Sequence, residues 1–162
     1  MRCIMAFAVI AAGIQATAAS AADDCAGFRK VYEARLSGFG EFQLHFDASE
    51  DAYRSSIDLP GARSCWVDGS RGKYHCRWTY RNTSREEITK NYRRLTEIAD
   101  ACVPPDEVRT ISNAYVGGNS MVGRHRIYLK RRDDVREMID VTASFWEDRS
   151  SGWVQLIIGH DL

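Results

Sequence analysis

Histidine and carboxylate side chains are the first candidates for chemistry, because together they bind metals or transfer protons. The chain has four histidines, and none of them forms a His-x-His, His-x-x-x-His or His-Glu-x-x-His motif. His45 and Asp47 are two residues apart, so an extended strand would place both on one face. His160 and Asp161 are adjacent, so in a strand their side chains would diverge. One such pair is too little for a metal site, and we expect neither a metal nor another cofactor.

Nucleophilic residues give no stronger signal of catalysis. The stretches Gly117-Gly118-Asn119-Ser120 and Asp68-Gly69-Ser70 are turn sequences and lack the Gly-x-Ser-x-Gly pattern of a hydrolase. The sequence also contains no Cys-x-x-Cys motif and no glycine-rich phosphate loop. We therefore do not expect an enzyme. The alternative is a hydrolase without a known motif, for which His45 and the polar segment 47–56 supply candidate residues.

A dense positive run that contains one tyrosine is the strongest candidate for a contact surface. Its residues are Arg124, Arg126, Tyr128, Lys130 and Arg132. If the apolar residues of a strand over 122–130 face the core, Arg124, Arg126 and Lys130 point outward. Such a face could meet an acidic partner, a lipid headgroup or a glycan. The alternative, which we favour, is cross-strand pairing with Asp140 and neighbouring acids, which leaves a mixed solvated surface. Exposed ion pairs contribute little, so replacing these basic residues should change stability only slightly.

The first 21 residues have the composition of a cleavable export signal. Arg2 supplies the positive start, residues 4–14 are apolar, and Ala19-Ser20-Ala21 fits the small-x-small rule for cleavage. The apolar stretch is far shorter than the ~20 residues that a membrane-spanning helix needs. We expect residues 1–21 to be a signal peptide and residues 22–162 to be a single disulfide-stapled globular domain. This domain would be periplasmic or secreted and would have no transmembrane segment.

Cysteine spacing indicates structural rather than reactive thiols. A cleaved signal removes one of the five cysteines, and an even number in an exported protein predicts two disulfides. If a hairpin turn is centred at residues 70–71, Cys65 lies directly opposite Cys76, at a separation that a disulfide can span. Cys25 then pairs with Cys102 by elimination.

Two helices are predicted from the spacing of apolar residues. The first runs from Cys25 to about Ser37, with Asp23 or Asp24 as its cap. The second begins after the capping box Ser84-Arg85-Glu86-Glu87 and ends before Pro104-Pro105, since proline cannot continue a helix.

The remaining elements are strands. They are expected over 42–46, 65–67, 74–80, 109–116, 122–130, 137–146 and 153–158, the first and fourth of these being the weakest, and segment 47–56 is expected to be a loop or a short helical turn. The order of helix, strands, helix, strands predicts an α+β fold. We expect an antiparallel sheet of about five to six strands with two helices packed on one face.

Charge limits the classes of partner. Without Arg2, 21 basic residues balance 22 acidic ones, so the mature chain is nearly neutral. A neutral chain is attracted only weakly to nucleic acid over long range, and we expect no nucleic-acid partner. We expect an exported binding or accessory protein of the envelope or the medium, acting through a protein or glycan contact surface. The alternatives are the hydrolase named above and a protein associated with the membrane surface.

Overall fold

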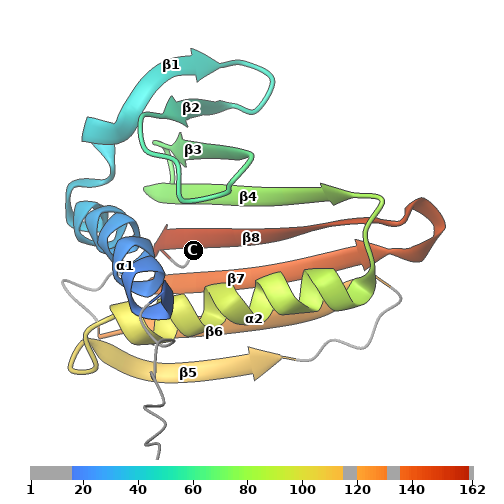
Figure 1. Ribbon diagram of the computed structural model, residues 1–162. Helices are drawn as coiled ribbons and strands as arrows, with labels where there is room; N and C mark the ends of the chain where they lie inside the picture. Colours follow the sequence, from blue (N-terminus) through green and yellow to red (C-terminus); the bar gives the residue numbers. More distant parts are fainter. Residues whose placement is uncertain (1–15, 115–119, 131–135, 161–162) are drawn as a thin grey trace, which may run out of the picture.

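The computed structural model describes residues 16–114, 120–130 and 136–160. These residues form an α+β fold in which two helices pack against one antiparallel sheet of eight strands (Figure 1). The helices are α1 (Ala16–Ala34) and α2 (Arg85–Cys102). The strands are β1 (Gln43–Asp47), β2 (Ala52–Ser55), β3 (Ser64–Asp68), β4 (Lys73–Arg81), β5 (Val108–Ala114), β6 (Met121–Leu129), β7 (Glu137–Trp146) and β8 (Ser151–His160).

The sheet is antiparallel as expected, but it is wider than the five to six strands expected from the sequence. Its order is β1-β2-β3-β4-β8-β7-β6-β5, and every neighbouring pair is antiparallel. The strand that had not been expected is β2, which lies within the polar segment 47–56. It has four residues and pairs with β1 and β3 on its two sides. A strand of this length is too short to show a clear alternation of polar and apolar residues.

The chain follows the same topology twice. In each half a helix is followed by four antiparallel strands, α1 with β1 to β4 and α2 with β5 to β8. The last strands of the two halves, β4 and β8, pair at the centre of the sheet, and the first strands, β1 and β5, form its two edges. The two halves are thus related by their topology around the β4–β8 pair. This arrangement places both helices on one side of the sheet (Figure 1).

The first helix begins earlier than expected. Asp23 and Asp24 lie inside α1, so the expected cap at these residues is wrong. After Ala34 the chain forms a 3-10 turn over Arg35–Ser37, which ends at Gly38. Gly38 has a φ of 71°, a left-handed conformation that glycine adopts without strain and that commonly ends helices.

The second helix begins as the sequence predicts. The side chain of Ser84 accepts a hydrogen bond of 3.2 Å from the backbone N–H of Glu87. This bond satisfies one of the free donors of the first turn. Ile88, Ala99 and Cys102 are the buried residues of the helix, and their stripe faces β6, β7 and β8.

Two disulfides stabilise the side of the sheet that the helices cover. Cys65 bonds Cys76, which stands directly opposite it in the β3–β4 hairpin, and Cys25 bonds Cys102, which joins α1 to the end of α2. These are the two pairs expected from the sequence. Because disulfides persist in oxidising compartments, they indicate an extracytoplasmic protein. Among the described residues, neither helix combines the length and the hydropathy that crossing a bilayer requires.

A buried ion-pair group fixes the end of α1 to the sheet. Arg35 is 3% exposed and donates from Nε to Glu137 of β7 at 3.0 Å and from Nη2 to Glu107 at 2.5 Å. Tyr32 donates its hydroxyl hydrogen to Glu107 at 2.7 Å, and the Arg35 guanidinium lies 3.7 Å from the centre of the Tyr32 ring. Removing one member would leave a buried charge without its partner. The covered side of the sheet is therefore closed by packing, disulfides and ion pairs.

Candidate functional site

The side of the sheet opposite α1 and α2, which we call the open face, carries two rows of side chains that cross most of the strands. The register of the strands aligns the members of each row, and alternation along each strand points them to the same side. One row is Arg54, Trp66, His75, Ile157, Asp140, Arg126 and Ser112, and the next is Ser64, Arg77, Gln155, Thr142 and Arg124. Neighbours on the same side are Lys73, Thr79, Arg81, Tyr128, Ser144, Trp146 and Trp153.

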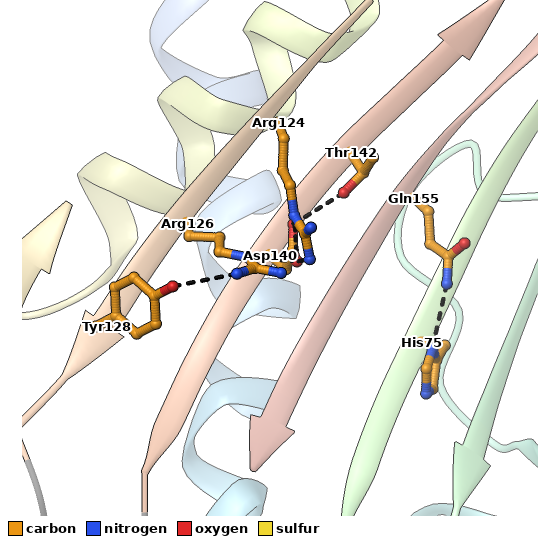
Figure 2. Close-up of polar contacts among 7 residues, drawn as sticks. All are labelled: His75, Arg124, Arg126, Tyr128, Asp140, Thr142 and Gln155. Atoms are coloured by element: carbon orange, nitrogen blue, oxygen red, sulfur yellow. Dashed lines mark hydrogen bonds and ion pairs between the residues drawn. The ribbon is translucent and has the colours of Figure 1, made fainter. Parts of the chain in front are cut away.

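One carboxylate organises the β6–β7 part of the open face (Figure 2). Asp140 is 1% exposed and accepts hydrogen bonds from the guanidinium groups of both Arg124 and Arg126. The hydroxyl of Thr142 donates to Asp140 at 2.8 Å, and Arg126 also donates from Nη1 to the hydroxyl of Tyr128 at 3.2 Å. Five side chains from two strands thus hold one another in fixed positions.

The Asp140 cluster corrects one expectation from the sequence. Cross-strand pairing of the arginines with Asp140 is present, as expected, but this pair is not a solvated surface contact. The carboxylate is buried, and a buried charge that loses its partners destabilises a protein strongly. Replacing both arginines would therefore change stability far more than the small effect expected for exposed ion pairs. Two guanidinium groups against one carboxylate leave the cluster with a net positive charge.

A second hydrogen-bonded chain crosses from β8 to β4 (Figure 2). Gln155 accepts a hydrogen bond of 2.9 Å from Nη2 of Arg77 and donates one of 3.2 Å to Nδ1 of His75. The His75 ring stacks on the indole of Trp66, with ring centres 5.2 Å apart and planes 5° from parallel. Burial lowers the pKa of His75 to about 4, so the ring is neutral at neutral pH. The acceptor role of Nδ1 fits this neutral form.

Arg77 lies between two tryptophans at the centre of the open face. Its guanidinium carbon is 5.2 Å from the ring centre of Trp66 and 5.6 Å from that of Trp153. These distances are within the range of cation–π attraction. The Nε of Arg77 is buried and has no hydrogen-bond partner among the described residues. The stacking therefore holds a positive charge in place without neutralising it.

The open face is more basic than the whole chain. Within the strands its charged residues are Arg54, Lys73, Arg77, Arg81, Arg124 and Arg126 on the basic side, and Asp47, Asp68 and Asp140 on the acidic side. It also holds three of the four tryptophans, Trp66, Trp146 and Trp153. The near-neutral charge of the sequence therefore hides a local surplus of positive charge on one side.

A hollow at the β1–β3 end of the open face bears on the hydrolase alternative. Its volume is about 150 Å³, and Asp47, Glu50, Arg54 and Arg77 contribute to its wall. Hydrogen bonds from Ser49 lower the pKa of Asp47, which keeps that carboxylate ionised. A carboxylate of low pKa is a weak general base. In the part of the chain that the structure describes, no group of three histidine, cysteine or acidic residues is placed to bind a metal.

The residues proposed from the sequence as a partner surface only partly come together. Arg124, Arg126 and Tyr128 lie side by side on the open face, in contact with one another or with Asp140. Lys130 is exposed just after the end of β6, outside this cluster. Arg132 lies outside the described residues.

Sequence reasoning did not bring together the residues of the other half of the open face. Trp66, Arg77 and Trp153 come from β3, β4 and β8, and the last of them is 76 positions after Arg77 in the chain. The outward side of β4 was visible in the sequence as the alternation of His75 and Arg77 with apolar residues. The pairing of β4 with β8 could not be predicted, because the alternation of residues along one strand indicates which side each residue faces and not which strands lie beside it.

The comparisons with known proteins do not name a relative. Family models, curated proteins and solved structures were all compared with the chain, and none of them matches it.

Proposed function

We propose that this chain is an extracytoplasmic binding protein, which receives an acidic surface of another protein on the open face of its sheet. One observation carries this proposal: arginine and tryptophan side chains are held in contact with one another across β3, β4 and β8, on the side that neither helix covers. An enzyme would need a group able to transfer a proton or attack a substrate, and the open face offers a neutral His75 of low pKa, an Asp47 of lowered pKa and a buried, doubly paired Asp140.

The composition of the open face favours a protein partner over a glycan. Tryptophan, tyrosine and arginine are the residues most enriched in the energetically dominant parts of protein interfaces. The open face combines Trp66 of β3, Trp153 of β8, Tyr128 of β6 and several arginines. The Trp66 ring already stacks on His75 and has the Arg77 guanidinium 5.2 Å from its centre, so little of it is left to stack on a sugar ring.

Preorganisation supports the same proposal. Binding normally immobilises long side chains at a cost of about 0.5–1.5 kcal/mol each. On the open face Arg124 and Arg126 are already fixed by Asp140, and Arg77 by Gln155 and two indoles. A partner therefore meets arginines whose conformations are set, which reduces the entropy lost on association.

The positive surplus selects an acidic partner. Complementary charge raises the association rate and disfavours partners of the wrong sign. Since the chain as a whole is nearly neutral, this attraction is local to the open face. The periplasm or the medium is the proposed location, with residues 1–21 as a cleaved export signal, and the two disulfides support an oxidising compartment.

Affinity capture with two matched charge reversals tests the proposal. Arg81→Glu places a negative charge on the open face, and Arg93→Glu places one on the outer side of α2; both arginines are exposed. Purified protein is used as bait in an extract of the native envelope and medium. We expect one acidic protein to be retained by the wild type and by Arg93→Glu, to be lost with Arg81→Glu, and to elute as salt rises.

Three outcomes would contradict the proposal. A captured polysaccharide would assign the open face to glycans. Retention on anionic lipid vesicles without a protein partner would favour the membrane-surface alternative. A protein partner lost equally from both variants would show that the open face is not the contact.

A further inference from the structure

A pocket of about 200 Å³ lies on the covered side of the sheet, away from the open face. Its wall is built by α1, α2, β4 and the segment that connects β2 to β3. The apolar part of the wall is Phe28, Leu59, Pro60, Trp78, Leu95 and Ile98. Phe28 and Trp78 are buried, whereas Leu95 and Ile98, on the side of α2 that packs against the core, stay partly exposed. Apolar surface is thus left in contact with water beside the core, and a ligand could cover it.

The pocket is held open by bonds on two sides. The indole N–H of Trp78 donates to the backbone carbonyl of Pro60 at 3.1 Å, which ties the β2–β3 segment to the sheet. The disulfide between Cys25 and Cys102 lies about one helical turn from Phe28 in α1 and from Ile98 in α2. A pocket fixed in this way exists before a ligand arrives, so binding need not order its walls.

Size restricts the ligand to a compact group. Sites for drug-sized molecules occupy about 300–1,000 Å³, and this pocket is smaller. One aromatic ring or one short acyl chain fits the volume and the apolar wall.

The mouth of the pocket is polar and carries one positive side chain. Among the described residues that form the wall, Arg94 is the charged one, and Asn91 and Tyr80 are polar. Lys90 and Arg93 lie close by on the same helix, but so do Glu86, Glu87 and Glu97, so the preference for an anion rests on Arg94 itself. Arg94 already takes part in another interaction. A guanidinium has five N–H donors, however, so it can also bind a carboxylate.

We propose that this pocket binds a small monocarboxylate whose ring or short acyl chain enters between Phe28, Trp78 and Ile98 and whose carboxylate meets Arg94. The apolar wall provides the burial and the arginine at the mouth provides the preference for an anion. The pocket and the open face lie on opposite sides of the sheet, so this inference stands independently of the proposed protein partner.

Binding is measured with two acids and their uncharged counterparts. The probes are octanoate and 3-phenylpropionate, with 1-octanol and 3-phenylpropanol as alcohols of matched shape. They are titrated into the disulfide-intact protein, and the nuclear magnetic resonance signal of the Trp78 indole N–H is followed. We expect saturable shifts of this signal and an affinity about tenfold higher for an acid than for its alcohol, as a charge-assisted contact would give. The stronger of the two acids distinguishes an acyl-chain ligand from an aromatic one.

Variants separate the pocket from nonspecific binding. Arg94→Gln should weaken acid binding by about tenfold and leave alcohol binding unchanged. Arg93→Gln is the matched control, because Arg93 lies on the same helix but outside the wall of the pocket. It should change neither affinity. Ile98→Trp should fill the pocket and weaken both acids and alcohols by more than about tenfold.

The proposal is overturned if neither acid gives a saturable shift, if acid and alcohol bind equally, or if Arg93→Gln acts like Arg94→Gln. Arg94 is exposed, so Arg94→Gln should fold like the wild type and give a result whether or not Ile98→Trp folds.

Discussion

Ile157 and Ile158 are neighbours in β8, yet their surroundings differ. Ile158 lies on the covered side within the apolar core and has no exposed surface. Ile157 lies on the open face between His75 and Asp140 and is partly exposed. The covered side excludes water by packing apolar side chains under two helices. The open face, which stays in contact with water, buries single groups such as Asp140 by stacking rings and pairing charges on one another.

The packing of the covered side is required for folding, whereas the ordered side chains of the open face are not. A core of apolar side chains is the main stabilising contribution to a fold. An uncovered sheet face needs only soluble side chains, and isolated lysines, threonines or glutamates would satisfy it. The open face instead buries Asp140 beneath two arginines and places Arg77 between two tryptophans. Such order on the uncovered side is typical of a contact surface.

The largest effect should come from the disulfides of the covered side. Cys25 and Cys102 are 77 positions apart, and Cys65 and Cys76 are 11 apart. The chain-entropy model gives about 4.5 kcal/mol for the long loop and about 3 kcal/mol for the short one. Denaturant unfolding of the two double serine variants should show this order. A larger loss from the Cys65–Cys76 pair would mean that native packing, and not loop closure, sets the contribution of these bonds.

Truncating the two isoleucines of β8 compares the two faces directly. Ile158→Ala should lower the free energy of unfolding by about 3 kcal/mol, because it leaves a cavity in the core. Ile157→Ala should lower it by about 1 kcal/mol, since the side chain is already partly in water. Both variants keep the same strand and the same chemical change. Equal losses in urea unfolding would contradict the distinction between the two faces.

Neutralising the buried carboxylate should disrupt the Asp140 cluster of the open face while leaving the apolar core intact. Asp140→Asn removes the anion that Arg124 and Arg126 share, and we expect a loss of about 2 kcal/mol. The loss stays below that of a fully enclosed pair because both arginines are partly exposed. Thermal unfolding measures it, and Thr142→Val, which removes one hydrogen bond to Asp140, is a milder control. No change for Asp140→Asn would mean that water already solvates the cluster.

The smallest effect depends on pH and reports the burial of His75. Burial lowers the pKa of this side chain from 6.5 to about 4, so the folded state resists a proton that the unfolded chain accepts. Stability should therefore fall as the pH falls from 6.5 toward 4. In His75→Gln this contribution is absent, and the variant should lose about 1–2 kcal/mol less than the wild type by about pH 5. If the free energy of unfolding changes with pH in the same way in both proteins, His75 is solvated in the folded state.

The sequence predicted the local elements of the fold better than their assembly. The hairpin register could be derived from the turn at residues 70–71, and it placed Cys65 opposite Cys76 as the structure does. The capping box at Ser84 located the start of α2. Both are signals contained in a few neighbouring residues. β2 was missed because four residues give no periodicity, and the earlier start of α1 was missed because the acidic pair Asp23-Asp24 resembles a cap.

The candidate site shows the same limit. Arg124, Arg126 and Tyr128 alternate within one strand, so the sequence alone could group them. The contacts of Arg77 with Trp66 and Trp153 depend on the pairing of β3, β4 and β8, which joins distant parts of the chain. The burial of Asp140 could not be predicted either, because it results from two arginines of the neighbouring strand that lie over the carboxylate.

Site-specific photocrosslinking tests the central claim, that the open face is where a protein partner binds. A photoreactive amino acid replaces Thr79, which is exposed on the open face opposite Trp153, or Arg93 on the outer side of α2 as the control. The variants are expressed in the native cell and irradiated, and the crosslinked peptides are identified. The account predicts a crosslink from position 79 to an acidic segment of one protein and no such crosslink from position 93. A partner that crosslinks from position 93 and not from position 79 would contradict it.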